Sequence, residues 1–277
     1  MKTTSCFAPS PTGLLHLGHA YSAALAAEAA RFLVRIEDLD PGRSQAEFIE
    51  AIGADMAWLG LEPAEAPLVQ SARGAVYEAA LERLRGEGLA YPCFCTRADI
   101  AAALSAPHSA GVHYPGTCRG LVDDPGRRAA EAHSWRIDAA RAVARVGLPG
   151  WREQGGALFA ATRAQIDDVI LARKDAPAAY HLACVVDDAA SGVTLVTRGV
   201  DLRRSTPVQR LLQMLLDLPE PAYRHHPLVT HADRRRLAKR DAAPTLAAMR
   251  ATGVDGRALV AALRTHRLPL GFALASA

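Results

Sequence analysis

Two histidines three residues apart, His16 and His19, end a proline- and glycine-rich segment of residues 7–19. An apolar stretch precedes this segment and an alanine-rich stretch, residues 20–30, follows it, which predicts a strand, a turn and a helix. On the first helical turn the imidazoles share a face, beside the N–H groups and dipole end that suit a phosphate. The pattern predicts stabilisation of a phosphoryl group undergoing displacement, with Gly18 giving the ligand access to the backbone. Two surface histidines on an ordinary turn are the alternative.

Three carboxylates, Glu37, Asp38 and Asp40, follow the next apolar stretch, residues 32–36, which is typical of a strand. In open α/β sheets, ligands bind beyond the carboxyl ends of the strands. These acids are therefore candidates for holding a substrate amine. A solvated acidic turn is the alternative.

Three thiols, Cys93, Cys95 and Cys118, lie close together in the middle of the chain. Such a cluster in a reducing compartment indicates zinc, which takes four ligands in a structural site. The fourth ligand could be His108, His113 or Tyr114, and by chemistry alone a histidine is the commoner choice. Three free thiols are the alternative.

A basic segment, residues 231–241, lies late in the chain and contains Lys239. It is typical of a polar loop whose charges face solvent or the phosphates of a nucleic acid. Two helices are predicted after it, at residues 245–251 and 255–264.

The composition is that of a globular protein of one large or two modest domains. The chain has 277 residues, half of them hydrophobic, and a formal net charge of +3. No apolar run reaches the length of a membrane span and no signal peptide is evident, so a cytoplasmic protein without a membrane partner is expected. An odd number of cysteines, five, argues against a disulfide framework. Because the net charge is small, nucleic acid would have to be bound by local basic clusters.

Several supporting elements are predicted from periodicity and punctuation. A helix over residues 20–31 meets the next strand without any Gly, Pro or Asn, so either the helix ends early or loop residues are absent. Ser44 and Glu47 form a capping box that opens a helix ending at Gly60. A helix over residues 71–85 turns four side chains inward, Val76, Tyr77, Leu81 and Leu84.

The histidine segment resembles the "HIGH" signature of class I aminoacyl-tRNA synthetases, and its Phe-Ala-Pro-Ser-Pro-Thr-Gly is like that of the glutamyl/glutaminyl branch. Residues 236–240 are similar to the "KMSKS" loop of the same family. Because both motifs occur in the right order, the chain is identified as a member of this family. Few residues follow this loop. In this respect, and in its three clustered cysteines, the chain is similar to the short glutamyl-Q type, which lacks an anticodon-binding domain.

The resemblance implies an α/β fold with a Rossmann-type catalytic domain. Residues 1–76 and 169–228 would form its halves, residues 77–168 a connective insertion with the zinc site, and residues 229–277 the KMSKS-like loop with a short helical tail. The implied activity is activation of glutamate by ATP with Mg²⁺, without tRNA, followed by glutamyl transfer to queuosine at the wobble position of tRNA(Asp). No obligate protein partner is evident.

The resemblance also implies site residues. Those for catalysis are His16, His19 and Lys239, and ATP is also bound by Pro9 and Gly18. Glutamate is bound by Phe7, Ala8, Pro9, Ser10, Glu37, Tyr180 and Arg198. Here Glu37 belongs to a segment similar to R-I-E-D, and Tyr180 to one similar to Y-x-L-A-x-V-V-D-D. For zinc, the short type has C-x-C followed by Y-x-x-x-C, which implies Cys93, Cys95, Tyr114 and Cys118.

One position departs from the family pattern. The family has arginine before Phe-Ala-Pro-Ser, and this chain has Cys6. A neutral thiol cannot replace a guanidinium that pairs with a carboxylate, so Arg198 would carry more of the recognition. Two alternatives follow: a truncated glutamyl-tRNA synthetase that charges a 3′ end, and a nonenzymatic RNA- or nucleotide-binding paralogue.

Overall fold

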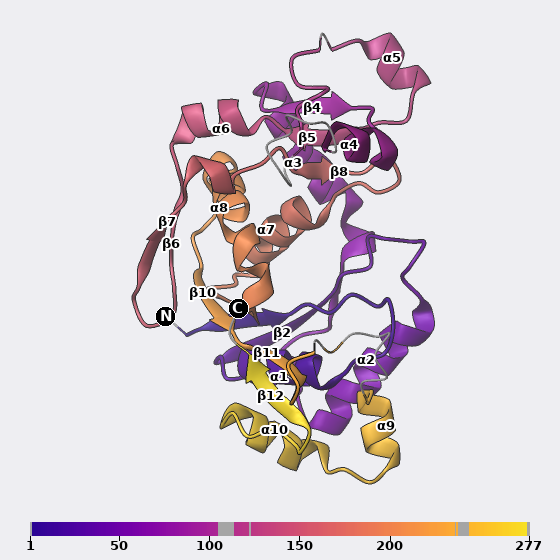
Figure 1. Cartoon of the computed structure of the whole chain (residues 1–277), viewed down its shortest axis with the longest axis vertical. Coiled ribbons are helices and arrows are strands. Elements are labelled where there is room, and N and C mark those ends of the chain that lie inside the picture. Colours follow the sequence, from indigo (N-terminus) through magenta and orange to yellow (C-terminus); the bar gives the residue numbers. More distant parts are fainter. Residues whose placement is uncertain (1, 105–113, 122, 236, 238–243, 276–277) are drawn as a thin grey trace.

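The computed structural model of the chain describes residues 2–104, 114–121, 123–235, 237 and 244–275 (Figure 1). Parallel strands form its central layer. β1 (Thr4–Phe7) pairs with β2 (Arg31–Ile36), which pairs with β3 (Leu68–Val69). β9 (Leu195–Gly199) pairs with β10 (Ala222–His226). The Thr194 N–H donates to the Thr4 carbonyl at 3.0 Å, which sets β9 beside β1.

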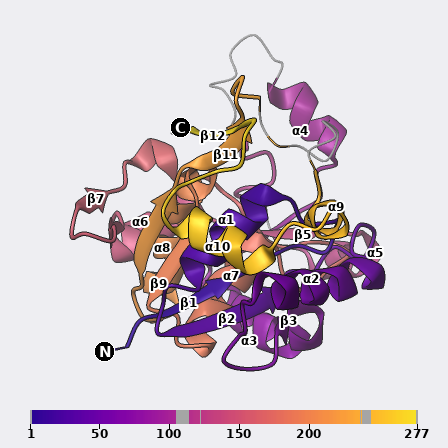
Figure 2. The same cartoon turned by 90° about the horizontal axis from the view of Figure 1, so that it is seen from below.

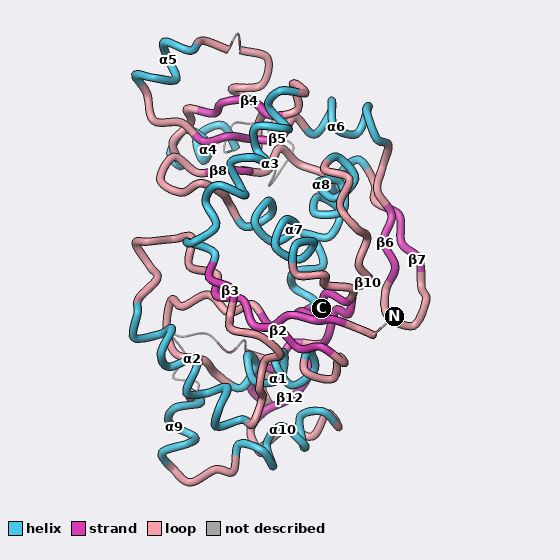
Figure 3. Tube along the Cα trace, turned by 180° about the vertical axis from the view of Figure 1, so that it is seen from behind, coloured by secondary structure: helices cyan, strands magenta, loops and turns pink. Residues whose placement is uncertain are grey.

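Helices cover both faces of these strands (Figure 3). One face carries α7 (Tyr180–Ala190), α8 (Thr206–Leu215) and α3 (Gly74–Gly86), whose apolar side chains share one core cluster. The other face carries α1 (Leu17–Ala26), α2 (Ala46–Leu59) and α10 (Gly256–Arg264), which build a second cluster with β1 and β2. Figure 2 shows α10 lying along α1, where Arg264 Nε donates to the Ala24 carbonyl at 3.3 Å.

The segment predicted to be an insertion forms the upper part of Figure 1, and its Ile137, Ala139 and Ala142 share the core cluster of α3, α7 and α8. Its sheet is antiparallel, with β5 (Ser134–Ile137) between β4 (Ala90–Cys93) and β8 (Ile170–Ala172). A hairpin of β6 (Gly150–Arg152) and β7 (Leu158–Ala160) extends from the insertion along the catalytic domain. The helices of this segment are α4 (Arg97–Leu104), α5 (Pro125–Ala130) and α6 (Ala139–Val146). β8, near the start of the predicted second half at residues 169–228, pairs with β5 and so belongs to this antiparallel sheet.

The C-terminal part packs against α1 and α2. β11 (Leu228–His231) pairs with β12 (Phe272–Ala275), and α9 (Leu246–Ala251) precedes α10. Short 3-10 turns cover Gln70–Arg73, Arg163–Gln165 and Val200–Ser205. The two predicted terminal helices are confirmed, and each has the side-chain cap that its sequence offers. Thr245 accepts from Ala248 N–H, and Asp255 accepts from Arg257 and Ala258 N–H.

The predicted first helix ends early, at Ala26. Glu28 and Ala29 N–H groups then bond the carbonyls three residues back, at 3.3 and 3.2 Å, and Arg31 N–H joins the sheet at Thr3 O. A short, all-alanine-and-glutamate turn thus replaces the expected Gly, Pro or Asn.

Two local predictions are wrong. The capping box of Ser44 and Glu47 does not form, because α2 begins one residue later with Gln45 at the N-cap. The Ser44 N–H is held by Asp40 O at 2.9 Å and the Gln45 N–H by Pro11 O at 3.1 Å, which carries the chain past the predicted start. Val76 does not face inward and is 42% exposed. The buried stripe of α3 runs through Tyr77, Leu81 and Leu84 instead.

Candidate active site

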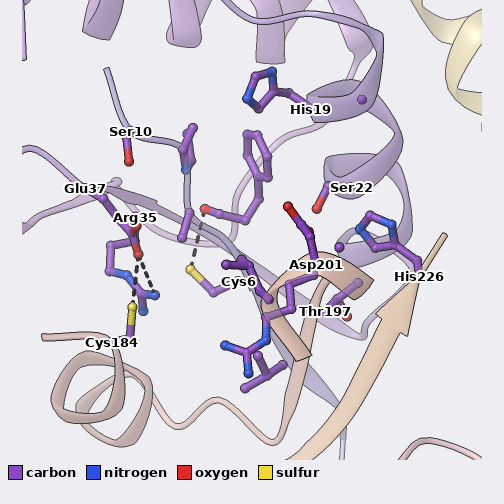
Figure 4. A pocket seen from close by; sticks show the side chains of 18 of the residues that line it. Cys6, Ser10, His19, Ser22, Arg35, Glu37, Cys184, Thr197, Asp201 and His226 are labelled. Atoms are coloured by element: carbon purple, nitrogen blue, oxygen red, sulfur yellow. Dashed lines mark hydrogen bonds and ion pairs between the residues drawn. The ribbon is translucent and has the colours of Figure 1, made fainter. Parts of the chain in front are cut away.

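A cavity of about 630 Å³ lies at the carboxyl ends of the parallel strands. β1, β2 and β9 all end at its wall, and the first turn of α1 closes one side. Figure 4 shows two groups of side chains in it. Glu37, Arg35 and Cys184 gather at one end, and His19, Ser22 and Asp201 lie beside α1. The cavity therefore has two chemically different ends.

The two histidines cap α1 with their own ring nitrogens. His16 occupies the N-cap position, and its Nδ1 accepts from the Gly18 N–H at 3.1 Å. The Nδ1 of His19 accepts from the His16 N–H at 3.1 Å, and the ring centroids are 3.9 Å apart. Because a backbone N–H always donates, the proton of each neutral ring is on Nε2. Both rings line the cavity at the N-terminal end of α1.

Gly18 is required by this cap as well as by the cavity wall. A Cβ at this position would lie 3.0 Å from Cε1 of His16. Any larger residue would push the His16 ring out of its place on the helix end. The sequence reasoning attributed this glycine only to ligand access.

At the other end, Glu37 is held by two neighbours. Its Oε1 accepts from Arg35 Nη2 at 3.1 Å and from the Cys184 thiol at 3.3 Å. Arg35 also binds Asp188, with 2.5 Å between Nη1 and Oδ1, and is only 5% exposed. Burial raises the pKa of Glu37, although the charge of Arg35 opposes this shift. A cation entering the cavity would favour the ionised carboxylate.

Arg198 has a different environment. Its guanidinium donates to Gln209 Oε1 at 2.6 Å, to Thr206 Oγ1 at 2.8 Å and to His225 Nε2 at 3.2 Å. No carboxylate among the described residues forms an ion pair with it. Tyr180 lies on the same wall, and burial raises the pKa of its phenol, so the hydroxyl is neutral. A buried cation with neutral partners is a ready site for an anionic ligand.

Cys6 lies on the cavity wall near Arg35, Glu37 and Asp188. Burial raises the pKa of this thiol to about 12, with Arg35 opposing the shift. The thiol is therefore neutral and supplies no charge for a carboxylate. Its close hydrogen-bond contact is with the Phe7 carbonyl, 3.6 Å from the sulfur.

The three cysteines of the insertion converge with Tyr114. The sulfurs of Cys93, Cys95 and Cys118 lie within 4.8 Å of one another, and the Tyr114 hydroxyl is 3.3 and 3.5 Å from the first two. Sulfurs bound to one tetrahedral zinc at 2.3 Å would be about 3.8 Å apart, and Cys95 and Cys118 are 3.5 Å apart. Four converging donors of this type fit a zinc ion. His108 and His113 lie outside the described residues.

The family model of the class I tRNA synthetases for glutamate and glutamine, catalytic domain, matches residues 2–269 of this chain. The chain belongs to this family. Proteins similar to this chain include several named glutamyl-Q tRNA(Asp) synthetase. The one from Nocardia farcinica is 44% identical over 268 residues, which cover 93% of this chain and 82% of the relative. The one from Rhodobacter capsulatus is 42% identical over 271 residues, which cover 90% and 95%.

A solved class I synthetase has the same fold. The glutamate tRNA ligase from Elizabethkingia meningosepticum, in complex with its amino acid, superposes with a TM-score of 0.77 at 23% identity. The match covers 95% of this chain and 60% of that protein.

None of the described helices of this chain is long and apolar enough to cross a bilayer.

The structure brings together nearly all of the residues that the resemblance assigned to the class I synthetase site. Those on the cavity wall are Phe7, Ala8, Pro9, Ser10, His16, Gly18, His19, Glu37, Tyr180 and Arg198. Lys239 lies outside the described residues, although Leu237 of the same motif is on the wall.

The sequence reasoning gave no role to Arg35, Asp188 or Cys184, which surround Glu37. One signal was present: Arg35 is a charge inside an otherwise apolar strand, and a buried charge requires a partner.

Proposed function

We propose that this chain activates glutamate with ATP in the absence of tRNA and then transfers the glutamyl group to queuosine at the wobble position of tRNA(Asp). The observation that carries this proposal is the identity of 41–44% to a series of proteins with that name. The cavity, with an anion-binding end at α1 and an ion-paired end at Glu37, supports it. We expect the reaction in the cytoplasm, where ATP and tRNA are available.

ATP occupies the end of the cavity formed by α1. The Nε2–H groups of His16 and His19 donate to phosphate oxygens, and Pro9 and Gly18 form the adjoining wall. Lys239 adds a positive charge that stabilises the departing pyrophosphate. Mg²⁺ bound with the nucleotide would neutralise further phosphate charge.

Glutamate occupies the other end. Glu37 accepts hydrogen bonds from the substrate ammonium, Arg198 binds a carboxylate, and Tyr180 and residues 7–10 enclose the chain of the amino acid. An oxygen of the α-carboxylate attacks the α-phosphorus of ATP, and the bond to pyrophosphate breaks. A hydroxyl of queuosine then attacks the activated carbonyl, its proton leaves, and AMP is released.

In the insertion, Cys93, Cys95, Cys118 and Tyr114 hold one structural zinc ion. The ion would link β4 to the segment around Cys118. Both segments are distant in sequence from the residues that line the cavity. Thiolate ligands with a phenolate suit a closed tetrahedral site without an open position for substrate.

Two measurements test the function. Glutamate-dependent exchange of pyrophosphate into ATP, without tRNA, is the expected first half-reaction. Labelled glutamate transferred to tRNA(Asp) should be found by nuclease mapping in the anticodon loop. Label on the terminal adenosine would instead indicate a truncated glutamyl-tRNA synthetase. Absence of exchange with every amino acid would favour a nonenzymatic paralogue.

A further inference from the structure

The guanidinium of Arg198 is held by a chain of hydrogen bonds that begins in the insertion. His225 lies between Arg198 and Glu153. Its Nε2 is 3.2 Å from Arg198 Nε, and its Nδ1 is 2.7 Å from Glu153 Oε1. The His225 side chain is 3% exposed and that of Glu153 16%. The three side chains come from β9, from β10 and from the hairpin β6–β7.

The direction of each bond in this chain is fixed by the chemistry of arginine. The Nε–H of Arg198 can only donate, so Nε2 of His225 must accept. The single proton of the neutral imidazole is then on Nδ1, where it donates to the Glu153 carboxylate. Glu153 therefore selects the tautomer of His225 that can bind Arg198.

The remaining contacts of Arg198 leave a defined part of the guanidinium for a ligand. Nη1–H donates to Gln209 and Nη2–H donates to Thr206. Of the five N–H bonds of the group, one on each terminal nitrogen is left. These two N–H groups are available to donate to the oxygens of a carboxylate.

We propose that Glu153 and His225 are positioning residues, which hold Arg198 in the orientation that binds the carboxylate of the amino-acid substrate. The proposal rests on the proposed function, because it assigns a carboxylate to Arg198. It adds a role for the insertion, whose hairpin supplies Glu153 to the amino-acid end of the cavity.

The hairpin is anchored firmly enough to serve this role. The Gln154 N–H donates to the Tyr223 carbonyl at 2.6 Å, and Arg210 Nε donates to the Gly150 carbonyl at 3.0 Å. The ring of Tyr223 stacks on His225 with 5.8 Å between centroids and 5° between planes. Backbone and ring contacts thus fix both Glu153 and His225 before any ligand binds.

The charges around His225 favour its neutral form. It faces Glu153 from the hairpin, Arg198 from β9, Arg203 from the turn Val200–Ser205 and the phenol of Tyr223 on its own strand. Burial lowers the pKa of His225, and the two arginines act in the same direction, while Glu153 opposes them. A protonated ring would direct a second N–H at Arg198 Nε and break the chain.

The test measures steady-state exchange kinetics of the full-length protein and a set of variants, over series of glutamate and ATP. His225→Phe keeps the ring stacked on Tyr223 and removes both nitrogens. Glu153→Leu removes the acceptor, and Glu153→Gln keeps an acceptor oxygen without the charge. Gln154→Ala, at an exposed neighbour on the same hairpin, is the matched control.

We expect His225→Phe and Glu153→Leu to raise the glutamate KM about tenfold, the cost of one hydrogen bond to a charged group. The ATP KM should stay unchanged in both, and Glu153→Gln should stay near wild type. Glu153 also accepts from Trp151 Nε1 at 3.2 Å, but it reaches Arg198 only through His225. The glutamate KM of the double variant should therefore be no higher than that of His225→Phe alone. A glutamate-induced rise in Tm, smaller in the variants, measures the same loss without catalysis.

Unchanged glutamate KM in folded Glu153→Leu and His225→Phe proteins would overturn the proposal, and so would additive effects in the double variant. If His225→Phe does not fold, the contrast between Glu153→Leu and Glu153→Gln decides the question alone. Wild-type protein with neither glutamate-dependent exchange nor a glutamate-induced Tm shift would refute the proposed function first, and this inference with it.

Discussion

The substitution Cys6→Arg should strengthen the binding of glutamate. The Cys6 thiol is neutral and lies beside two carboxylates, Glu37 and Asp188, and one guanidinium, that of Arg35. A second guanidinium at this position would balance the excess negative charge of that group. It would also place a second cation, besides Arg198, within reach of a substrate with two carboxylates.

The expected size of the effect follows from two opposing contributions. A hydrogen bond between charged groups contributes about 1.5–3 kcal/mol, and overpacking a filled core costs about 1–3 kcal/mol. Here Cys6 borders a cavity of about 630 Å³, so the longer side chain has open space and the steric cost is small. A net gain of about 1.4 kcal/mol lowers the glutamate KM about tenfold, and the ATP KM should stay as it is.

Exchange kinetics over a glutamate series, with melting curves for each protein, measure this effect. Cys6→Met is the matched control, because it lengthens the side chain without adding charge. A folded Cys6→Arg protein with unchanged or weaker glutamate dependence would refute the reasoning. The new guanidinium would then pair with Glu37 and occupy the acceptor for the substrate ammonium.

Three further predictions concern the zinc site, the loop that contains Lys239, and the carboxylate of Glu37. The protein should contain one zinc per chain by metal analysis, and Cys95→Ser should lose it while Cys184→Ser, outside the cluster, keeps it. Lys239→Ala should slow exchange about a hundredfold to a thousandfold, or about 2.7–4 kcal/mol, and near-normal exchange would show that the loop is misassigned. The glutamate KM should rise as the pH falls through the raised pKa of Glu37, because the protonated acid cannot pair with an ammonium. Glu37→Gln should flatten this profile, and an unchanged profile would exclude Glu37 as its origin.

Local signals in the sequence predicted local structure well where nothing distant competed. Thr245 and Asp255 begin their helices as expected, since each cap needs only the next few backbone N–H groups. Ser44 offers an equally good signal and fails. Its backbone N–H is bound by Asp40, four residues before it, and that of Gln45 by the distant Pro11. The spacing of Ser44 and Glu47 reveals neither contact.

The resemblance located the wall of the cavity but not the side chains that set its charge. Asp188 is 153 positions from Arg35, and the two meet only because β2 ends beside α7. Glu153 is 72 positions from His225, and their contact depends on where the hairpin of the insertion docks. Such pairs follow from the topology of the whole chain, so motif spacing cannot predict them.

Two buried arginines, on the strands β2 and β9 that flank β1, show why their partners decide the function of each. Arg35 is 5% exposed and Arg198 is 8% exposed, and both line the same cavity. Arg35 is bound to two carboxylates, so a substrate carboxylate would have to displace one of them and leave it unpaired, which is costly. Arg198 is bound only to neutral acceptors, so an anionic substrate adds a partner and displaces none. For this reason we assign the carboxylate to Arg198, and to Arg35 the orientation of Glu37.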